Sequence, residues 1–204
     1  MKKFIFIQAR MSSKRLPGKV LMGFRGSNVM RYLYDKCAQI KGINNIVILT
    51  SLNEDDNKIE EYCKENKMAF FRGSLENVLQ RFKDAAEFFC NDDDLVIRLC
   101  ADSPLLDKNL LQDFVSELSN QDQFVSTRVL KNCTFTSTTG KGNNIDAMKV
   151  SDLHMIDGKN DLIREHIIYG FDFRGKFRLY LPKESLRENG CVDTKSDYVK
   201  LAKC

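Results

Sequence analysis

The sequence predicts an α/β fold with a Rossmann-like, doubly wound and mostly parallel sheet. Short runs rich in β-branched and aromatic residues alternate with segments of helical period. These runs are continuously apolar, which is typical of strands that are buried on both faces. The connections are short, which favours right-handed crossovers. In such sheets, ligands bind at the carboxyl ends of the strands.

The expected strands and helices alternate through the first 130 residues. Strands are predicted at residues 4–7, 46–50, 69–71, 95–99 and 124–127, and helices at residues 29–40, 55–66, 76–89 and 108–118. In the third of these helices, apolar residues from Val78 to Phe89 recur at spacings of three and four. This spacing places one apolar stripe against the sheet.

The second half of the chain has a weaker pattern. Residues 132–144 are polar, β-prone and broken by glycine, which predicts an extended excursion at about residues 131–146. Helical pattern returns near residue 153 and at residues 161–169, followed by a strand at 177–181 and a closing helix at 196–203. No linker-like stretch divides the chain, so residues 1–204 are expected to form one domain.

Positive charge is concentrated at the start of the chain. Residues 1–34 carry eight lysine and arginine residues and no carboxylate, whereas the formal net charge of the whole protein is +4. The remaining residues are therefore net negative. A protein that follows a nucleic-acid backbone would present a broader basic surface, so we expect a small anionic ligand and no nucleic acid.

The basic segment forms a loop directly after the first apolar strand. Its candidate binding side chains are Arg10, Ser12, Ser13, Arg15 and Lys19. Pro17 fixes one backbone angle and Gly18 permits an unusual one, so the loop can fold back and aim Lys19 toward the arginines. Cations and hydroxyls at the end of a buried strand are suited to a triphosphate. The alternative is that these are solvated surface charges.

Two aspartates follow short apolar segments further along the chain. Asp102 comes after the fourth strand and precedes Pro104, and Asp193 precedes the last helix. Two carboxylates beside a triphosphate suggest Mg²⁺, which shares its remaining coordination with phosphate and water. Helix capping is the alternative role for both residues.

The cysteines and the amino terminus point to a cytoplasmic protein. Seven cysteines occur without a Cys-x-x-Cys pair, which argues against a disulfide framework and a zinc site and favours a reducing compartment. The first apolar stretch is only about four residues long, too short for a signal peptide or a membrane span. We therefore expect no membrane partner.

Residues 9–21 resemble the signature loop of the acylneuraminate and 3-deoxy-octulosonate cytidylyltransferases, especially of the spore-coat polysaccharide branch. Further matches follow in order at residues 71–74 with 78–82, 101–107, 164–166 and 192–194. Together they cover nearly the whole chain. The resemblance implies a sheet of the nucleotide-diphospho-sugar transferase type.

The resemblance also implies a reaction and a set of site residues. The reaction is Mg²⁺-dependent transfer of CMP from CTP to a sugar or sugar-like acceptor with release of pyrophosphate, for surface polysaccharide or glycan biosynthesis. The implied catalytic residues are Arg10, Lys19 and Asp102, and the implied metal ligands are Asp102 and Asp193. The implied nucleotide-binding residues are Ala9, Arg10, Ser12, Ser13, Arg15, Lys19 and Ala101. The candidate acceptor-binding residues are Arg72, Asn144, Asp146, Arg164, Glu165 and His166.

Some features depart from the family pattern and keep alternatives open. Ala101 stands where relatives commonly have glycine, and residues 142–146 differ from the acidic segment of the branch. A nucleotide-sugar-dependent glycosyltransferase of similar fold and a non-catalytic nucleotide-binding module are the alternative functions. The chain is shorter than the relatives that dimerise through an extra excursion, which leaves a homodimer as an open alternative.

Overall fold

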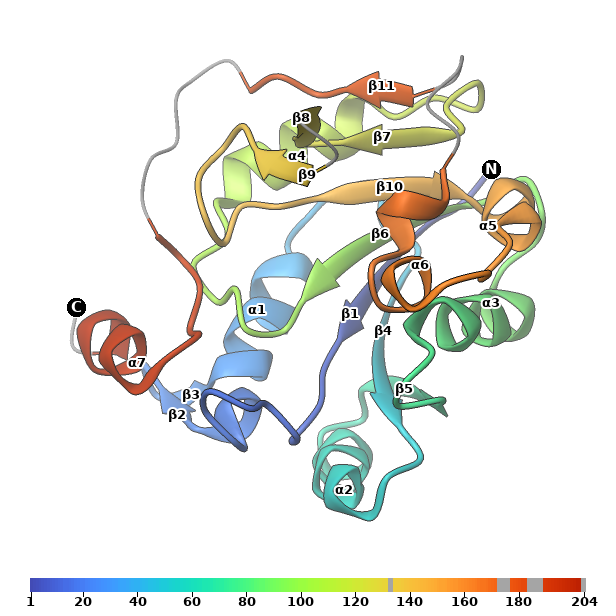
Figure 1. The fold of residues 1–204 in the computed structure, drawn as a ribbon. Helices are drawn as coiled ribbons and strands as arrows, with labels where there is room; N and C mark the ends of the chain where they lie inside the picture. Colours follow the sequence, from blue (N-terminus) through green and yellow to red (C-terminus); the bar gives the residue numbers. More distant parts are fainter. Residues whose placement is uncertain (132–133, 172–176, 183–188, 203–204) are drawn as a thin grey trace.

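Seven strands form the central sheet of the computed structural model, which describes residues 1–131, 134–171, 177–182 and 189–202 (Figure 1). These strands are β1 (Lys3–Gln8), β4 (Asn45–Ser51), β5 (Ala69–Gly73), β6 (Leu95–Cys100), β7 (Phe124–Ser126), β10 (Asp146–Lys149) and β11 (Phe177–Leu179). Their order across the sheet is β11-β7-β10-β6-β1-β4-β5. Strand β10 runs antiparallel to both neighbours, β6 and β7, whereas the other pairs are parallel. The predicted doubly wound, mostly parallel sheet is thus confirmed.

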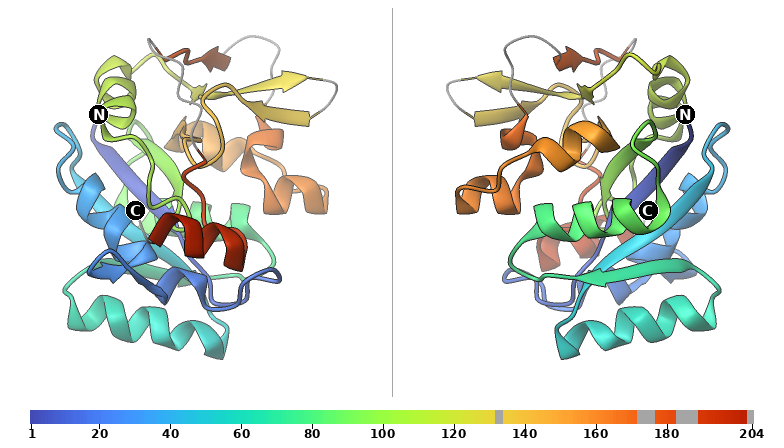
Figure 2. Two further views of the ribbon diagram at one scale, coloured as in Figure 1. Left: turned by 90° about the vertical axis from the view of Figure 1, so that its left-hand side faces the viewer. Right: turned by 90° about the vertical axis from the view of Figure 1, so that its right-hand side faces the viewer.

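Helices cover both faces of the sheet (Figure 2). Alternate residues of β1 point to opposite faces because the side-chain period of a strand is two. Ile5 and Ile7 pack in one core with α1 (Val29–Cys37), α2 (Asn57–Glu65) and α4 (Lys108–Glu117). Phe4 and Phe6 pack in the other core with α3 (Val78–Phe89) and α5 (Val150–Met155).

Side-chain caps fix the start of three of these helices. The side chains of Asn28, Asn77 and Asp107 accept hydrogen bonds from backbone amides in the first turns of α1, α3 and α4. Such caps satisfy donors that have no partner within the helix. Helix α3 therefore begins two residues later than predicted. A 3₁₀ turn, η2 (Glu54–Asp56), likewise precedes α2.

The second half of the chain holds the main differences from the prediction. Strand β10 was not expected, and the predicted excursion contains β9 (Thr134–Ser137), which pairs antiparallel with β8 (Arg128–Lys131) just before it. The predicted helix at 161–169 is divided into α6 (Asp161–Glu165) and the 3₁₀ turn η3 (Ile167–Gly170). Residues 132–133 of the excursion and residue 203 of the predicted last helix lie outside the described residues.

The order of the strands opens a crevice at the end of β1. From β1 the chain moves to β4 and β5 on one side, then returns to form β6 on the other side of β1. The loops that leave β1 and β6 consequently diverge, and this point of reversal is where doubly wound sheets bind ligands.

The last segment of the chain returns to this crevice. Helix α7 (Lys195–Ala202) packs Leu201 against Phe24, which belongs to the small hairpin of β2 (Gly23–Phe24) and β3 (Ser27–Asn28). The Val192 amide donates to the Asp102 carbonyl over 2.7 Å. Residues 191–194 therefore lie beside the end of β6. Among the described helices, none is both long and apolar enough to cross a membrane.

Candidate active site

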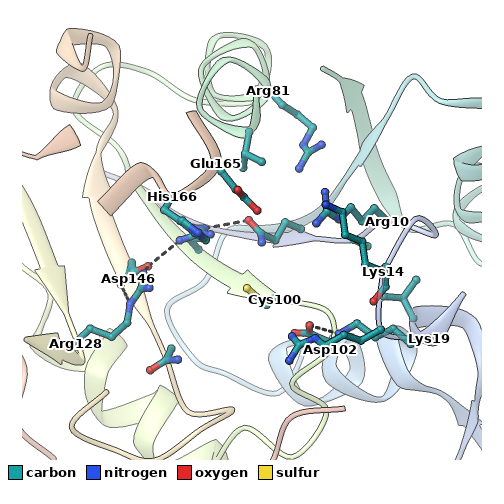
Figure 3. A pocket seen from close by; sticks show the side chains of 18 residues that line it. Arg10, Lys14, Lys19, Arg81, Cys100, Asp102, Arg128, Asp146, Glu165 and His166 are labelled. Carbon is teal, nitrogen blue, oxygen red and sulfur yellow. Dashed lines mark hydrogen bonds and ion pairs between the residues drawn. The ribbon is translucent and has the colours of Figure 1, made fainter. Parts of the chain in front are cut away.

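A cavity of about 470 Å³ lies where the carboxyl ends of β1 and β6 diverge (Figure 3). It is lined by residues from the first loop, the ends of the central strands, α3 and the late segments of the chain. They are Gln8, Ala9, Arg10, Ser13, Lys14, Arg15, Lys19, Val20, Val78, Arg81, Arg98, Cys100, Asp102, Arg128, Asn144, Asp146, Glu165 and His166.

The loop after β1 is closed upon itself by backbone hydrogen bonds. The Met11 carbonyl accepts from the amides of Ser13, over 2.9 Å, and Gly18, over 2.8 Å. Gly18 has a φ of +72°, a conformation that glycine adopts without steric cost. The Met11 amide donates to Asp56 Oδ1 over 2.7 Å, which fixes the loop to the end of β4. The folding back predicted from Pro17 and Gly18 is confirmed.

Lys19 is the most buried cation of this loop, with an exposed fraction of 6%. Its Nζ donates to Asp102 Oδ2 over 2.6 Å, to the Val192 carbonyl over 2.8 Å and to Asp193 Oδ1 over 3.2 Å. Burial alone lowers the pKa of Lys19, but the charges and hydrogen bonds of Asp102 and Asp193 outweigh it, so the pKa is raised. The ammonium therefore joins the two aspartates that the sequence singled out.

Asp193 is surrounded by positive charge. Its Oδ1 also accepts from Arg15 Nη2 over 2.7 Å, and its Oδ2 lies 2.6 Å from Lys141 Nζ. Burial favours the protonated acid, but the hydrogen bond from Lys141 and the charge of Lys19 lower the pKa of Asp193 below its ordinary value. The carboxylate is thus ionised at neutral pH.

The donor set at this point fits a hard divalent cation. Single ligand atoms of Asp102, Cys191 and Asp193 lie within 4.8 Å of one another. Two carboxylates match the oxygen preference of Mg²⁺, which binds through one or two protein carboxylates. Burial raises the pKa of the Cys191 thiol, so it stays protonated and is a poor ligand. Asp102 and Asp193 are therefore the side chains that fit a metal.

Arg81 projects from α3 toward the same cavity and has a buried guanidinium, with an exposed fraction of 3%. Its Nη1 donates to the Ser74 carbonyl over 2.8 Å, whereas its Nε has no hydrogen-bond partner among the described residues. Burial lowers the pKa of Arg81 to about 10, so the side chain remains charged at neutral pH. Figure 3 shows Arg81, Arg10 and Lys14 on one side of the cavity.

A buried ionic cluster forms the opposite side of the cavity. Asp146 accepts from Ser126 Oγ over 2.7 Å, lies 3.3 Å from Arg98 Nη1 and is also paired with Arg128. Arg98 Nε donates to Gln8 Oε1 over 3.1 Å, which joins the cluster to the end of β1. Burial alone raises the pKa of Asp146, but the two guanidinium groups reverse this and lower it.

Glu165 and His166 approach this side from the end of α6 (Figure 3). Desolvation and the charge of Arg98 lower the pKa of His166 below 6.5, although Glu165 partly offsets them. The imidazole is therefore neutral at pH 7 and can accept a proton. Together with Asn144 and Asp146, these residues bring most of the predicted acceptor-binding set to one wall.

Several predicted site residues are placed elsewhere. Arg72 donates to the carbonyls of Ser51 and Asn53 over 2.8 and 2.9 Å and is paired with Glu60, so its guanidinium holds the loop before α2. Arg164 Nε donates to the carbonyl of Gly158, in the segment that precedes α6, over 2.9 Å. Arg72, Arg164, Ser12, Ala101 and Asp193 are not among the described residues that line the cavity, although Asp193 contacts Lys19, which does line it.

Lys14, Arg81, Arg98, Arg128 and Lys141 have no role predicted from the sequence. For Arg98 a signal was present: an arginine inside the apolar run of β6 must be buried, and a buried charge needs a partner. Arg81 lies on the polar edge of an apolar helical stripe, where sequence alone does not separate it from a surface residue. Lys141 lies in the segment with the weakest pattern.

A doubly wound sheet with a cationic loop and paired carboxylates at its point of reversal defines a nucleotidyltransferase. A family model described as Cytidylyltransferase matches residues 4–201 of this chain. The chain belongs to this family, and it is accordingly an enzyme of the nucleotidyltransferase class.

Individual relatives agree with this membership. The spore coat polysaccharide biosynthesis protein SpsF of Bacillus subtilis is 30% identical over 205 residues, covering 94% of this chain and 81% of SpsF. The structure of a cytidylyltransferase from Leptospira borgpetersenii is 31% identical with a TM-score of 0.86, covering 100% of this chain and 86% of that one. CMP:2-keto-3-deoxy-manno-octonic acid synthetase, solved in complex with CTP, shares the fold with a TM-score of 0.76 at 16% identity, covering 100% of this chain and 98% of that one.

Proposed function

We propose that this enzyme transfers CMP from CTP to a sugar or sugar-like acceptor, with release of pyrophosphate, in a reaction that depends on Mg²⁺. The observation that carries the proposal is the contact of the Lys19 ammonium with both Asp102 and Asp193 at the edge of the cavity. Membership of the cytidylyltransferase family supports CTP as the donor. The relationship to SpsF supports an acceptor used in polysaccharide biosynthesis.

The cations of the first loop are proposed to bind the triphosphate. Arg10, Lys14 and Arg15 are exposed to the cavity, where they can approach the β- and γ-phosphate oxygens. Negative charge develops on the pyrophosphate as it leaves, so fixed cations stabilise the transition state more than the ground state. Ser13, which also lines the cavity, adds a neutral donor to this end.

Asp102 and Asp193 are the residues that would hold Mg²⁺. When bound, the metal supplies electrostatic stabilisation of the charge on the α-phosphate. Lys19 lies between the two carboxylates and keeps them close together without a nucleotide. Once phosphate oxygens enter the cavity, the same ammonium can turn toward them over a short path.

The acceptor is proposed to lie against the wall that contains Asn144, Asp146, Glu165 and His166. An acceptor oxygen forms a bond to the α-phosphorus, the bond from this phosphorus to the bridging oxygen breaks, and pyrophosphate leaves with those electrons. The hydroxyl proton of the acceptor passes to His166, whose lowered pKa makes it neutral and able to accept. Positioning and charge neutralisation supply most of the acceleration.

A screen of pyrophosphate release tests the proposal directly. The protein is incubated with each of the four common nucleoside triphosphates, with Mg²⁺ or EDTA, and with a panel of acidic and neutral sugars. We expect release with CTP, Mg²⁺ and one class of sugar, and none with EDTA. Release with another nucleotide in preference to CTP, or hydrolysis of a nucleotide sugar in preference to CTP, would contradict the proposal.

A further inference from the structure

Lys141 contacts Asp193 from outside the cavity. Its Nζ lies 2.6 Å from Asp193 Oδ2, and its side chain keeps an exposed fraction of 51%. Among the residues that the structure describes, Lys141 is not one of those that line the cavity. It belongs to the turn between β9 and β10, so it reaches Asp193 from a different part of the chain than Arg15 and Lys19 do.

Close packing of two backbone segments fixes this turn. The Gly190 amide donates to the Lys141 carbonyl over 2.9 Å. A Cβ atom at Gly142 would lie 2.6 Å from the carbonyl carbon of Gly190, so only a glycine permits this approach. The turn is thereby held against the segment that carries Asp193.

Both oxygens of the Asp193 carboxylate are paired with cationic side chains. Oδ1 is shared by Arg15 and Lys19, and Oδ2 is paired with Lys141. Arg15 and Lys19 line the cavity and can transfer to phosphate oxygens when a nucleotide enters. Lys141 does not line the cavity, so a divalent cation that reaches Asp193 meets its like charge.

We propose that Lys141 is a positioning residue that neutralises and orients Asp193 while the nucleotide is absent, and that it leaves Oδ2 when a metal–nucleotide complex binds. This inference rests on the proposed function, because it assumes that Asp193 is a metal ligand. Lys141 thus weakens metal binding before the nucleotide arrives, and it makes occupation of the metal site depend on the nucleotide.

Calorimetry without an acceptor tests the inference. The affinity for CTP is measured with saturating Mn²⁺ and again with EDTA, and the ratio of the two affinities gives the contribution of the metal. In Lys141→Ala the metal should bind the nucleotide-free protein more tightly, so we expect this ratio to fall by about threefold to fivefold, the size of a partly exposed ion pair. Affinity for CTP in EDTA should stay near the wild-type value, because Lys141 does not face the phosphates.

Two control variants separate this role from loss of charge or of structure. Lys64→Ala removes an ion pair of the same 2.6 Å length from α2, with a lysine exposed by 62%, and should leave the ratio unchanged. Lys141→Arg should keep the wild-type ratio, because it retains the positive charge. A wild-type ratio in Lys141→Ala would overturn the inference. A wild-type protein that binds CTP equally well with Mn²⁺ and EDTA would instead overturn the proposed metal dependence.

Discussion

Lys19 is the residue whose loss should affect catalysis most directly. In Lys19→Ala, we expect turnover to fall by at least about 100-fold, because a buried cation next to the reacting phosphates is removed. Pyrophosphate release at saturating CTP measures this change. Lys19→Ala also removes a buried ion-pair partner of Asp102 and Asp193, so the thermal unfolding midpoint should fall as well, and turnover is compared at a temperature at which both proteins are folded. A variant with wild-type turnover would show that Lys19 has no catalytic role.

The pKa of His166 predicts how turnover falls at acidic pH. Its pKa is lowered by burial and by Arg98, so the neutral form dominates at pH 7 and is lost only as the pH falls below 6.5. Turnover that needs the neutral imidazole should therefore decline below pH 6.5. In His166→Gln we expect lower turnover and no such decline, measured as pyrophosphate release from pH 5 to 8. An unchanged profile in the variant would exclude His166 as the proton acceptor.

Asp146 supports stability as well as the acceptor wall. In Asp146→Asn, two buried guanidinium groups lose their charge partner, and we expect the free energy of unfolding to fall by about 3 kcal/mol. Asp93→Asn, which removes an exposed ion pair with Lys149, should change it by less than about 1 kcal/mol. Urea titration of both variants measures the difference, and equal small losses would contradict the assigned role.

The pH dependence of the free energy of unfolding should also reflect the ionisation of Asp146. The pKa of Asp146 is lower in the folded protein than in the unfolded chain, so its contribution is complete above the ordinary aspartate pKa of about 4. It is lost as the pH falls through the lower, folded-state pKa. Urea titrations between pH 7 and pH 3 should therefore show a smaller acid-dependent loss in Asp146→Asn than in the wild type.

For single residues, the sequence predicts the location of exposed charges in the loop after β1 better than the location of buried charges within the sheet. The predicted proximity of the Lys19 loop to Asp102 follows from the rule that parallel strands end at one edge of the sheet. The role of Arg72 in holding the loop before α2 depends on carbonyl groups that only the fold brings together. Arg128 and Asp146 are brought together by the order of the strands, which their local sequence does not predict.

At the level of structural elements, the turn between β9 and β10 tests whether close packing against the backbone of Gly190 positions Asp193. Gly142→Ala places a methyl group 2.6 Å from the backbone of Gly190 at a φ of +94°. We expect loss of about 2 kcal/mol of stability and weaker CTP binding, since Asp193 is displaced. Thermal unfolding and calorimetry measure the two effects.

Gly26→Ala is the matched control for this substitution. Its φ of +81° is similar, but a Cβ there meets nothing within 4 Å. Gly26→Ala therefore has only the conformational cost of a positive φ, which should lower the free energy of unfolding by about 1 kcal/mol, and it has no steric clash. Equal effects of the two variants on CTP binding would show that the turn does not position Asp193.

Element prediction succeeds where periodicity is strong and fails where the strand is short. Strands β1, β4, β5 and β6 and helices α1, α2, α3 and α4 have apolar patterns that burial imposes directly. Strand β10 has four residues and begins with the buried Asp146, so its sequence shows no strand-like run. Helix α6 ends after five residues at His166, which has a non-helical backbone conformation and lines the cavity.

For the whole molecule, the separation of charge predicts how CTP binding responds to salt. The first 34 residues are strongly basic while the rest of the chain is net negative, and four cations of this segment, Arg10, Lys14, Arg15 and Lys19, line the cavity. We expect CTP affinity to fall by about tenfold between 50 and 500 mM NaCl, because the Debye length shortens. Calorimetry at several salt concentrations measures this dependence. Uncharged cytidine, the control ligand, should bind with little dependence on salt.

The sheet order also determines when each wall of the cavity can form during synthesis. Strand β7 pairs with β10 and β11, both of which lie later in the chain. Strands β1, β4, β5 and β6 can associate as soon as residue 100 has emerged, whereas β7 waits for residues 146–149. Ser126 and Arg128 meet Asp146 only at that stage. The wall with the basic loop can thus form first, and the wall proposed to bind the acceptor is completed only after residues 146–149 have been synthesised.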